Sequence, residues 1–189
     1  MKPRTLIFVP HADNESLALS GYLQRFQRTE NIYIIIFSSG NDPISEKFQS
    51  VICDEILEKF NITYLILDFK ACYFNNVRDK LSKIIEGSVN NFKPNKILMC
   101  GDFELHQDYK TINHLCKIAS KTKIHNFIKE IYEYSVPESE QFSSTYFDTV
   151  LQLSPKEMME KLQDVNKYTT EYLPTIPNCE FFRTVFRRL

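Results

Sequence analysis

The chain has only four glycines among its 189 residues. Neither a P-loop nor a G-x-G-x-x-G fingerprint is present, so these two routes to nucleotide binding are not expected. The G-x-S-x-G elbow of the Ser-His-Asp hydrolases is also missing. No run of 18 apolar residues occurs, and we therefore expect no membrane span.

The chain also lacks a strong charge of either sign, since its formal net charge is −1. This balance argues against nucleic-acid binding through a basic face. Three arginines near the end, at positions 183, 187 and 188, are interpreted as a solvated basic tail. The first residues lack a signal-peptide pattern, which predicts a cytoplasmic protein.

Cysteine spacing gives no sign of a metal-binding or redox motif. The five cysteines are odd in number and contain no C-x-x-C pair. Most of them stand among apolar residues, so reduced core thiols are expected rather than disulfides or a cysteine zinc site. The cysteines are Cys53, Cys72, Cys100, Cys116 and Cys179.

Apolar runs alternate with helix-like stretches along most of the chain. This alternation predicts a single α/β domain over residues 1–189, a Rossmann-like three-layer sandwich with a mostly parallel sheet. The runs are continuous, as expected of strands covered on both faces. The predicted strands are Leu6–Val9, Ile32–Ser38, Thr63–Leu67, Lys96–Cys100, Ile131–Ser135 and Thr149–Leu153, and the predicted helices are Ser16–Gln27, Ser45–Phe60, Val77–Phe92, Lys110–Lys121 and Pro155–Tyr168.

Two polar clusters stand between a predicted strand and the helix after it. The first reads HADNE at residues 11–15, and the second reads HQDY at residues 106–109. Asp13 or Asn14 could simply cap the following helix, and His11 could be a turn residue. However, His-x-Asp follows a strand twice, and the carboxyl ends of parallel strands are where such sheets bind ligands. We therefore expect both clusters to line one cleft.

The two clusters and their spacing resemble the PIG-L/LmbE superfamily of zinc-dependent N-deacetylases, which remove acyl groups from amino sugars. The first signature of that family is His-Pro-Asp-Asp-Glu, and the second is His-x-Asp-His. Further similarities are the apolar strand that ends in Ser-Ser-Gly at residues 38–40, the segments at 134–137 and 147–150, and Glu-Phe-Phe at 180–182. The resemblance spans nearly the whole chain.

The resemblance places a zinc ion on residues that this chain has partly replaced. The positions of the family's ligands are His11, Asn14 and Tyr109 here. Zinc prefers imidazole, thiolate or carboxylate ligands, whereas Asn14 offers a neutral carbonyl oxygen and Tyr109 a phenol. Two such changes predict that zinc binding at these positions is weak or absent.

The acid–base groups that the resemblance implies are retained. Asp13 stands at the position of the general base, and His106 at that of the residue that stabilises the oxyanion or acts as an acid. Asp108 is expected to pair with His106 and orient it. Amide hydrolysis requires such a base, a polarised carbonyl and a proton for the leaving amine.

These residues leave three interpretations open. The leading one is an N-deacetylase-like amide hydrolase acting on an N-acylated amino sugar or glycoconjugate. The second is a sugar-binding or scaffold homologue without catalysis, and the third is a metal-independent enzyme of different chemistry on the same fold. The replaced ligands favour the last two, whereas the retained acid–base groups favour an enzyme. The sequence does not indicate which sugar is bound or what oligomer forms.

Overall fold

The computed structural model describes residues 2–40, 43–137, 147–168 and 176–188, with the side chains of 43–46 left aside. Seven strands and five α-helices alternate along these residues, and one short 3-10 helix, η1, follows the third strand. The elements are β1 Arg4–His11, α1 Asn14–Phe26, β2 Asn31–Ser38, α2 Pro43–Lys59, β3 Thr63–Ile66, η1 Phe74–Val77, α3 Arg78–Phe92, β4 Lys96–Cys100, α4 Gln107–Ala119, β5 Glu130–Tyr134, β6 Thr149–Gln152, α5 Pro155–Tyr168 and β7 Cys179–Arg187.

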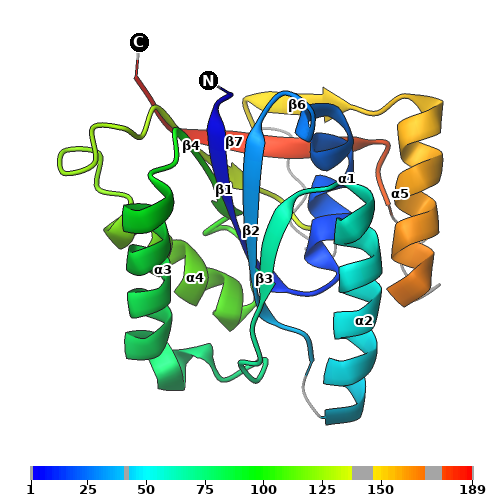
Figure 1. The fold of residues 1–189 in the computed structure, drawn as a ribbon, viewed down its shortest axis with the longest axis horizontal. Helices are drawn as coiled ribbons and strands as arrows, with labels where there is room; N and C mark the ends of the chain where they lie inside the picture. The colour runs from blue at the N-terminus through cyan, green and yellow to red at the C-terminus, as the bar shows by residue number, and fades with distance from the viewer. Residues whose placement is uncertain (1, 41–42, 138–146, 169–175, 189) are drawn as a thin grey trace.

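The strands form one sheet in the order β3-β2-β1-β4-β5-β7-β6. Strands β1 to β5 pair in parallel, whereas β7 runs antiparallel to both β5 and β6. Helices α1, α2 and α5 cover one face and α3 and α4 cover the other, giving three layers (Figure 1). The predicted three-layer α/β fold with a mostly parallel sheet is confirmed.

The central strands are buried because helices cover both of their faces. In β1, the six residues from Thr5 to Pro10 are all buried. Its neighbour β2 is buried continuously from Ile34 to Ser38. A strand exposed on one face would alternate apolar and polar residues, so these continuous runs match the two covered faces. Strands β2, β1 and β4 lie side by side and run parallel, so their carboxyl ends share one edge of the sheet. The two polar clusters follow β1 and β4 and therefore lie at this edge.

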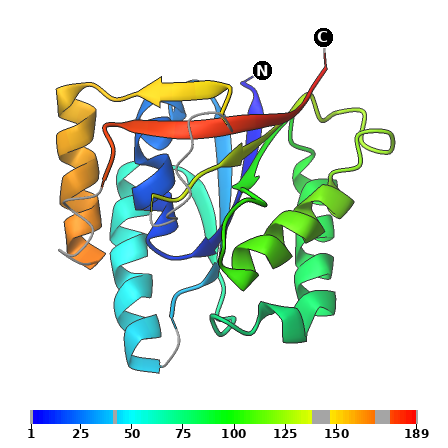
Figure 2. The same ribbon diagram turned by 180° about the vertical axis from the view of Figure 1, so that it is seen from behind.

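The last strand was not predicted from the sequence, and the interpretation of the three terminal arginines as a tail is wrong, although Arg187 and Arg188 are exposed to solvent. Arg183 and Arg187 belong to β7 and Arg188 directly follows it. This strand lies between β5 and β6 in the sheet, and Figure 2 shows it in red beside the yellow β6. Arg183 forms ion pairs with the buried Glu133 and with Asp102. Charged residues therefore interrupt the apolar pattern of β7, and acidic residues on neighbouring segments neutralise the charge of Arg183.

No helix in the described part of the chain is long and apolar enough to cross a bilayer.

Candidate functional site

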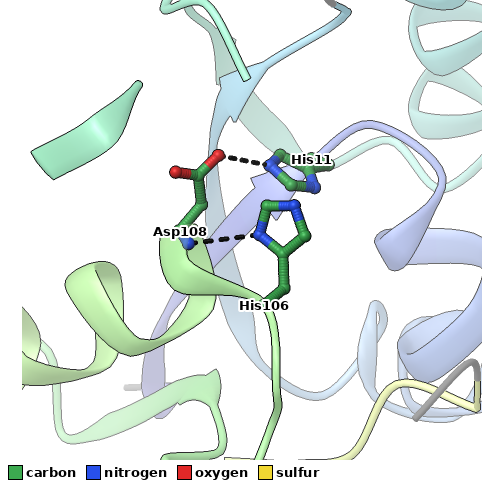
Figure 3. A group of neighbouring side chains, drawn as sticks. All are labelled: His11, His106 and Asp108. Atoms are coloured by element: carbon green, nitrogen blue, oxygen red, sulfur yellow. Dashed lines mark hydrogen bonds and ion pairs between the residues drawn. The ribbon is translucent and has the colours of Figure 1, made fainter. Parts of the chain in front are cut away.

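The end of β1 and the start of α4 bring three titratable side chains together. His11 is the last residue of β1, and His106 and Asp108 stand at the N-terminus of α4. The ring centroids of the two histidines are 4.9 Å apart. Figure 3 shows both rings and the Asp108 carboxylate facing one another. The expectation that the two sequence clusters meet at one site is confirmed for these residues.

Asp108 is the buried anchor of this group. One carboxylate oxygen, Oδ2, accepts hydrogen bonds from His11 Nε2 at 3.0 Å and from the backbone N–H of Cys72 at 2.6 Å. The other oxygen, Oδ1, accepts the backbone N–H of Phe74 at 3.2 Å. Burial favours the neutral acid and alone would raise the pKa of Asp108, but the hydrogen bonds from His11 and the two amides outweigh it. The pKa of Asp108 is therefore lowered, and the carboxylate is ionised at neutral pH.

The carboxylate contacts a different histidine from the one that the family resemblance implies. Asp108 is expected to orient His106, yet its carboxylate bonds to His11. His106 instead accepts the backbone N–H of Asp108 through Nδ1, at 3.1 Å. The reason is local: His106 is the N-cap of α4, and its ring satisfies an amide that the helix leaves free. Helix capping thus explains the contact that His106 makes within the second cluster.

These contacts define a tautomer for each ring. An ionised carboxylate only accepts hydrogen bonds, so His11 carries a proton on Nε2. His106 accepts a backbone N–H through Nδ1, so its own proton is on Nε2. The site therefore holds two Nε2–H groups, one on His11 that donates to Asp108 and one on His106 that lies beside the Cys72 sulfur.

The first cluster forms a tight corner between β1 and α1. Asp13 is the N-cap residue, but its side chain makes no capping hydrogen bond. Its backbone has φ 96°, a left-handed conformation that is costly for a residue other than glycine. The Asp13 carboxylate accepts the side-chain amide of Asn14 at 2.8 Å, and the Asp13 amide donates to Glu15. Capping therefore does not account for Asp13, and strained residues of this kind cluster at functional sites.

The positions of the family's zinc ligands do not fit a zinc ion well. Asn14 is buried, and its Oδ1 accepts no hydrogen bond in the described part of the chain. That atom provides one neutral oxygen. Tyr109 is also buried, with its ring 5.2 Å between centroids from each of the two histidine rings. Only His11 is a strong zinc ligand among the three, so these three positions do not make a zinc site.

A different set of donor atoms is better suited to a cation. Ligand atoms of His11, His106 and Asp108 all lie within 4.8 Å of one another. Imidazole and carboxylate are both ordinary ligands of divalent transition metals.

Cys72 is a site residue that the sequence reasoning missed, because the thiol was interpreted as part of the core. It is exposed, in the loop between β3 and η1, and its Sγ lies 3.6 Å from His106 Nε2. Its backbone carbonyl accepts the side chain of Gln107 at 2.6 Å. The only signal in the sequence was topological: a loop that follows a parallel strand returns to the carboxyl edge of the sheet.

The ionised Asp108 makes a testable contribution to stability. A lowered folded-state pKa stabilises the protein above the unfolded value of about 3.9, and this contribution is lost as the pH falls through the folded value. We expect Asp108→Asn to lower the free energy of unfolding at pH 7 by about 1.5–3 kcal/mol, the range for hydrogen bonds to a charged group. The difference from the unmodified protein should shrink below about pH 4. Urea unfolding across this pH range is the measurement, and a difference independent of pH would contradict the assignment.

No protein-family model matches the chain, and no curated protein matches it in sequence. Several solved structures share its fold. A teicoplanin deacetylase superposes with a TM-score of 0.75 at 14% identity, covering 98% of each chain. The N,N'-diacetylchitobiose deacetylase of Pyrococcus horikoshii gives 0.70 at 12% identity, covering 96% of this chain and 83% of that one. The 4-carboxy-2-hydroxymuconate hydratase of Pseudomonas putida gives 0.72 at 14% identity, covering 100% and 98%.

Proposed function

We propose that the chain is an N-deacetylase-type amide hydrolase acting on an N-acylated amino sugar or glycoconjugate. The observation that carries the proposal is the pair of histidines at the carboxyl edge of the sheet, each oriented by a hydrogen bond to Asp108 that leaves a proton on Nε2. Two of the proteins with the same fold are deacetylases by name, and their structures cover nearly all of this chain. The retained His-x-Asp signatures add to that similarity.

In the proposed reaction, each of the two clusters supplies a different catalytic group. His106 donates its Nε2 proton in a hydrogen bond to the acyl carbonyl oxygen and stabilises the negative charge that develops there. Asp13 accepts a proton from the attacking water and passes it to the leaving amine. His11 is held by Asp108, and its ring packs against the His106 ring and positions it. A metal at the family's positions is given no part, because Asn14 and Tyr109 are poor ligands.

A second candidate is a reaction of different chemistry on the same fold. The hydratase from Pseudomonas putida has the same fold, and hydration also requires a base and a proton donor. The two candidates differ in their product, since hydrolysis releases an amine and a carboxylate whereas hydration of a double bond releases nothing.

The proposal is tested by incubating the purified chain with a panel of N-acetylated amino sugars and following acetate by NMR. We expect release of acetate with EDTA present, because the proposed groups belong to the protein. Asp13→Asn should abolish release, because an amide does not accept the proton from water, while the unfolding midpoint stays nearly unchanged.

Two other results would each replace the proposal. Binding of a sugar without acetate release, with or without added metal, would favour the sugar-binding scaffold. Full activity in Asp13→Asn would show that this carboxylate is not the base.

A further inference from the structure

Four side chains with metal-ligating atoms, rather than three, come together at this site. The exposed Cys72 thiol contacts His106 Nε2, and the Cys72 amide is bonded to the same Asp108 oxygen that contacts His11. Cys72 is therefore held against the group formed by His11, His106 and Asp108. Imidazole, thiolate and carboxylate are the three ligand types that zinc selects.

Two of the distances between these donor atoms are close to those around a tetrahedral ion. With zinc–sulfur at about 2.3 Å and zinc–nitrogen at about 2.0 Å, two such ligands lie about 3.5 Å apart. The observed separation of Cys72 Sγ and His106 Nε2 is 3.6 Å. A nitrogen and a carboxylate oxygen on the same ion lie about 3.3 Å apart, and His11 Nε2 and Asp108 Oδ2 are 3.0 Å apart.

We propose that His11, His106, Asp108 and Cys72 form a binding site for one zinc-class divalent ion, displaced from the positions that the family resemblance implies. A thiolate with two imidazoles selects borderline ions such as Zn²⁺ and Co²⁺ over Mg²⁺ and Ca²⁺, which prefer oxygen ligands. Cys72 is exposed, whereas the Asp108 side chain is fully buried. The ion would therefore enter the site from solvent on the Cys72 side.

Binding of the ion requires a defined movement of protons. The Cys72 thiol releases one proton to solvent and binds as the thiolate. The proton of each ligating imidazole moves from Nε2 to the other ring nitrogen, so the bond from the Asp108 amide to His106 opens. The hydrogen bond between His11 and Asp108 is replaced by two bonds to the ion. With the contact between Cys72 Sγ and His106 Nε2, three hydrogen bonds are thus exchanged for four bonds to the metal.

This site goes beyond the proposed hydrolysis and does not depend on it. The ion would occupy His106 Nε2, the atom that donates to the acyl oxygen in the proposed reaction. Metal-bound and hydrolytic states of the site are therefore alternatives. Binding can be measured in the absence of any sugar, so failure of one proposal leaves the other standing.

The other thiols do not complicate a test of Cys72. Burial raises the pKa of Cys53, Cys100 and Cys116 well above its usual value, which disfavours the thiolate at these positions. Cys179 is partly exposed at the start of β7 and provides a matched control.

The experiment is a titration of the EDTA-dialysed full chain with Co²⁺, followed by the cobalt–thiolate charge-transfer band. We expect one ion per chain with this band, and no comparable binding of Mg²⁺. Cys72→Ser should lose the band and bind at least about tenfold more weakly, because even indirect changes at metal sites cost 10–100-fold. Cys179→Ser should behave as the unmodified chain. Thermal unfolding of each variant confirms that its fold is intact.

Two results would overturn the proposed site. One is binding without a charge-transfer band, or a band that persists in Cys72→Ser. The other is cobalt binding that is lost in Asn14→Ala or Tyr109→Phe but retained in Cys72→Ser, which would place the ion at the family's positions instead.

Discussion

Replacing His106 with alanine should lower the turnover of an N-acetylated amino sugar at least about 100-fold, the lower end for a group that moves or shares a proton in the transition state. The reason is specific to its tautomer. The Asp108 amide occupies Nδ1, so Nε2–H is the one donor that the ring presents to a substrate. Without it, the charge on the acyl oxygen loses a hydrogen bond that strengthens as the water attacks. Initial rates of acetate release provide the measurement.

The structural role of His106 needs its own control, because the ring also caps α4. Loss of an N-cap costs about 1 kcal/mol of stability, so His106→Ala is compared with His106→Asn, which retains a capping side chain. His114 lies on the same helix with its side chain exposed, and His114→Ala should leave the rate unchanged. A rate for His106→Ala within threefold of the unmodified chain would remove His106 from the reaction.

Replacing Glu180 with alanine should lower the free energy of unfolding by about 3–5 kcal/mol, the range for breaking a buried ion pair by removing one partner. Glu180 and Lys161 are both fully buried, with Oε1 and Nζ 3.2 Å apart. The Glu180 carboxylate also accepts the backbone amides of Gly21 at 2.7 Å and Tyr22 at 2.9 Å. Its loss would leave the Lys161 charge and two amides of α1 without this partner, in a site that joins α1, α5 and β7.

The matched control is another carboxylate paired with a lysine of α5. Glu55 contacts Lys167 at 3.1 Å, but its side chain is 60% exposed. Glu55→Ala should therefore change stability by no more than about 1 kcal/mol. Urea unfolding of both variants gives the comparison. Equal losses in the two variants would contradict the view that burial of Glu180 makes this pair important.

The fold could be predicted because the sequence pattern of its central strands is unambiguous. The apolar runs of β1, β2 and β4 are continuous, and periodic helices separate them. Helices α1 and α4 begin a few residues earlier than predicted, at Asn14 and Gln107, because each starts inside a polar cluster. Strand β7 was missed because Glu180 and Arg183 interrupt its pattern, and their partners lie on other elements that only the folded chain brings near.

The meeting of the two clusters was predicted, but the contacts between their side chains were not. That His11 and His106 would meet followed from two strands sharing one edge of the sheet. Which histidine the Asp108 carboxylate would contact did not follow, because this depends on the capping geometry at the start of α4. Cys72 could not be identified from spacing, since it belongs to a loop distant in sequence from both clusters. The roles of Asp13, His106 and Asp108 in catalysis remain predictions.

The central proposal, hydrolysis of an N-acyl group by attack of water, is tested most directly in oxygen-18 water. The purified chain is incubated with an N-acetylated amino sugar and EDTA, and the released acetate is analysed by mass spectrometry. The proposal predicts acetate that carries one oxygen-18 atom, together with one free amine for each acetate. Absence of released acetate with every sugar tested, or acetate without the label, would contradict it.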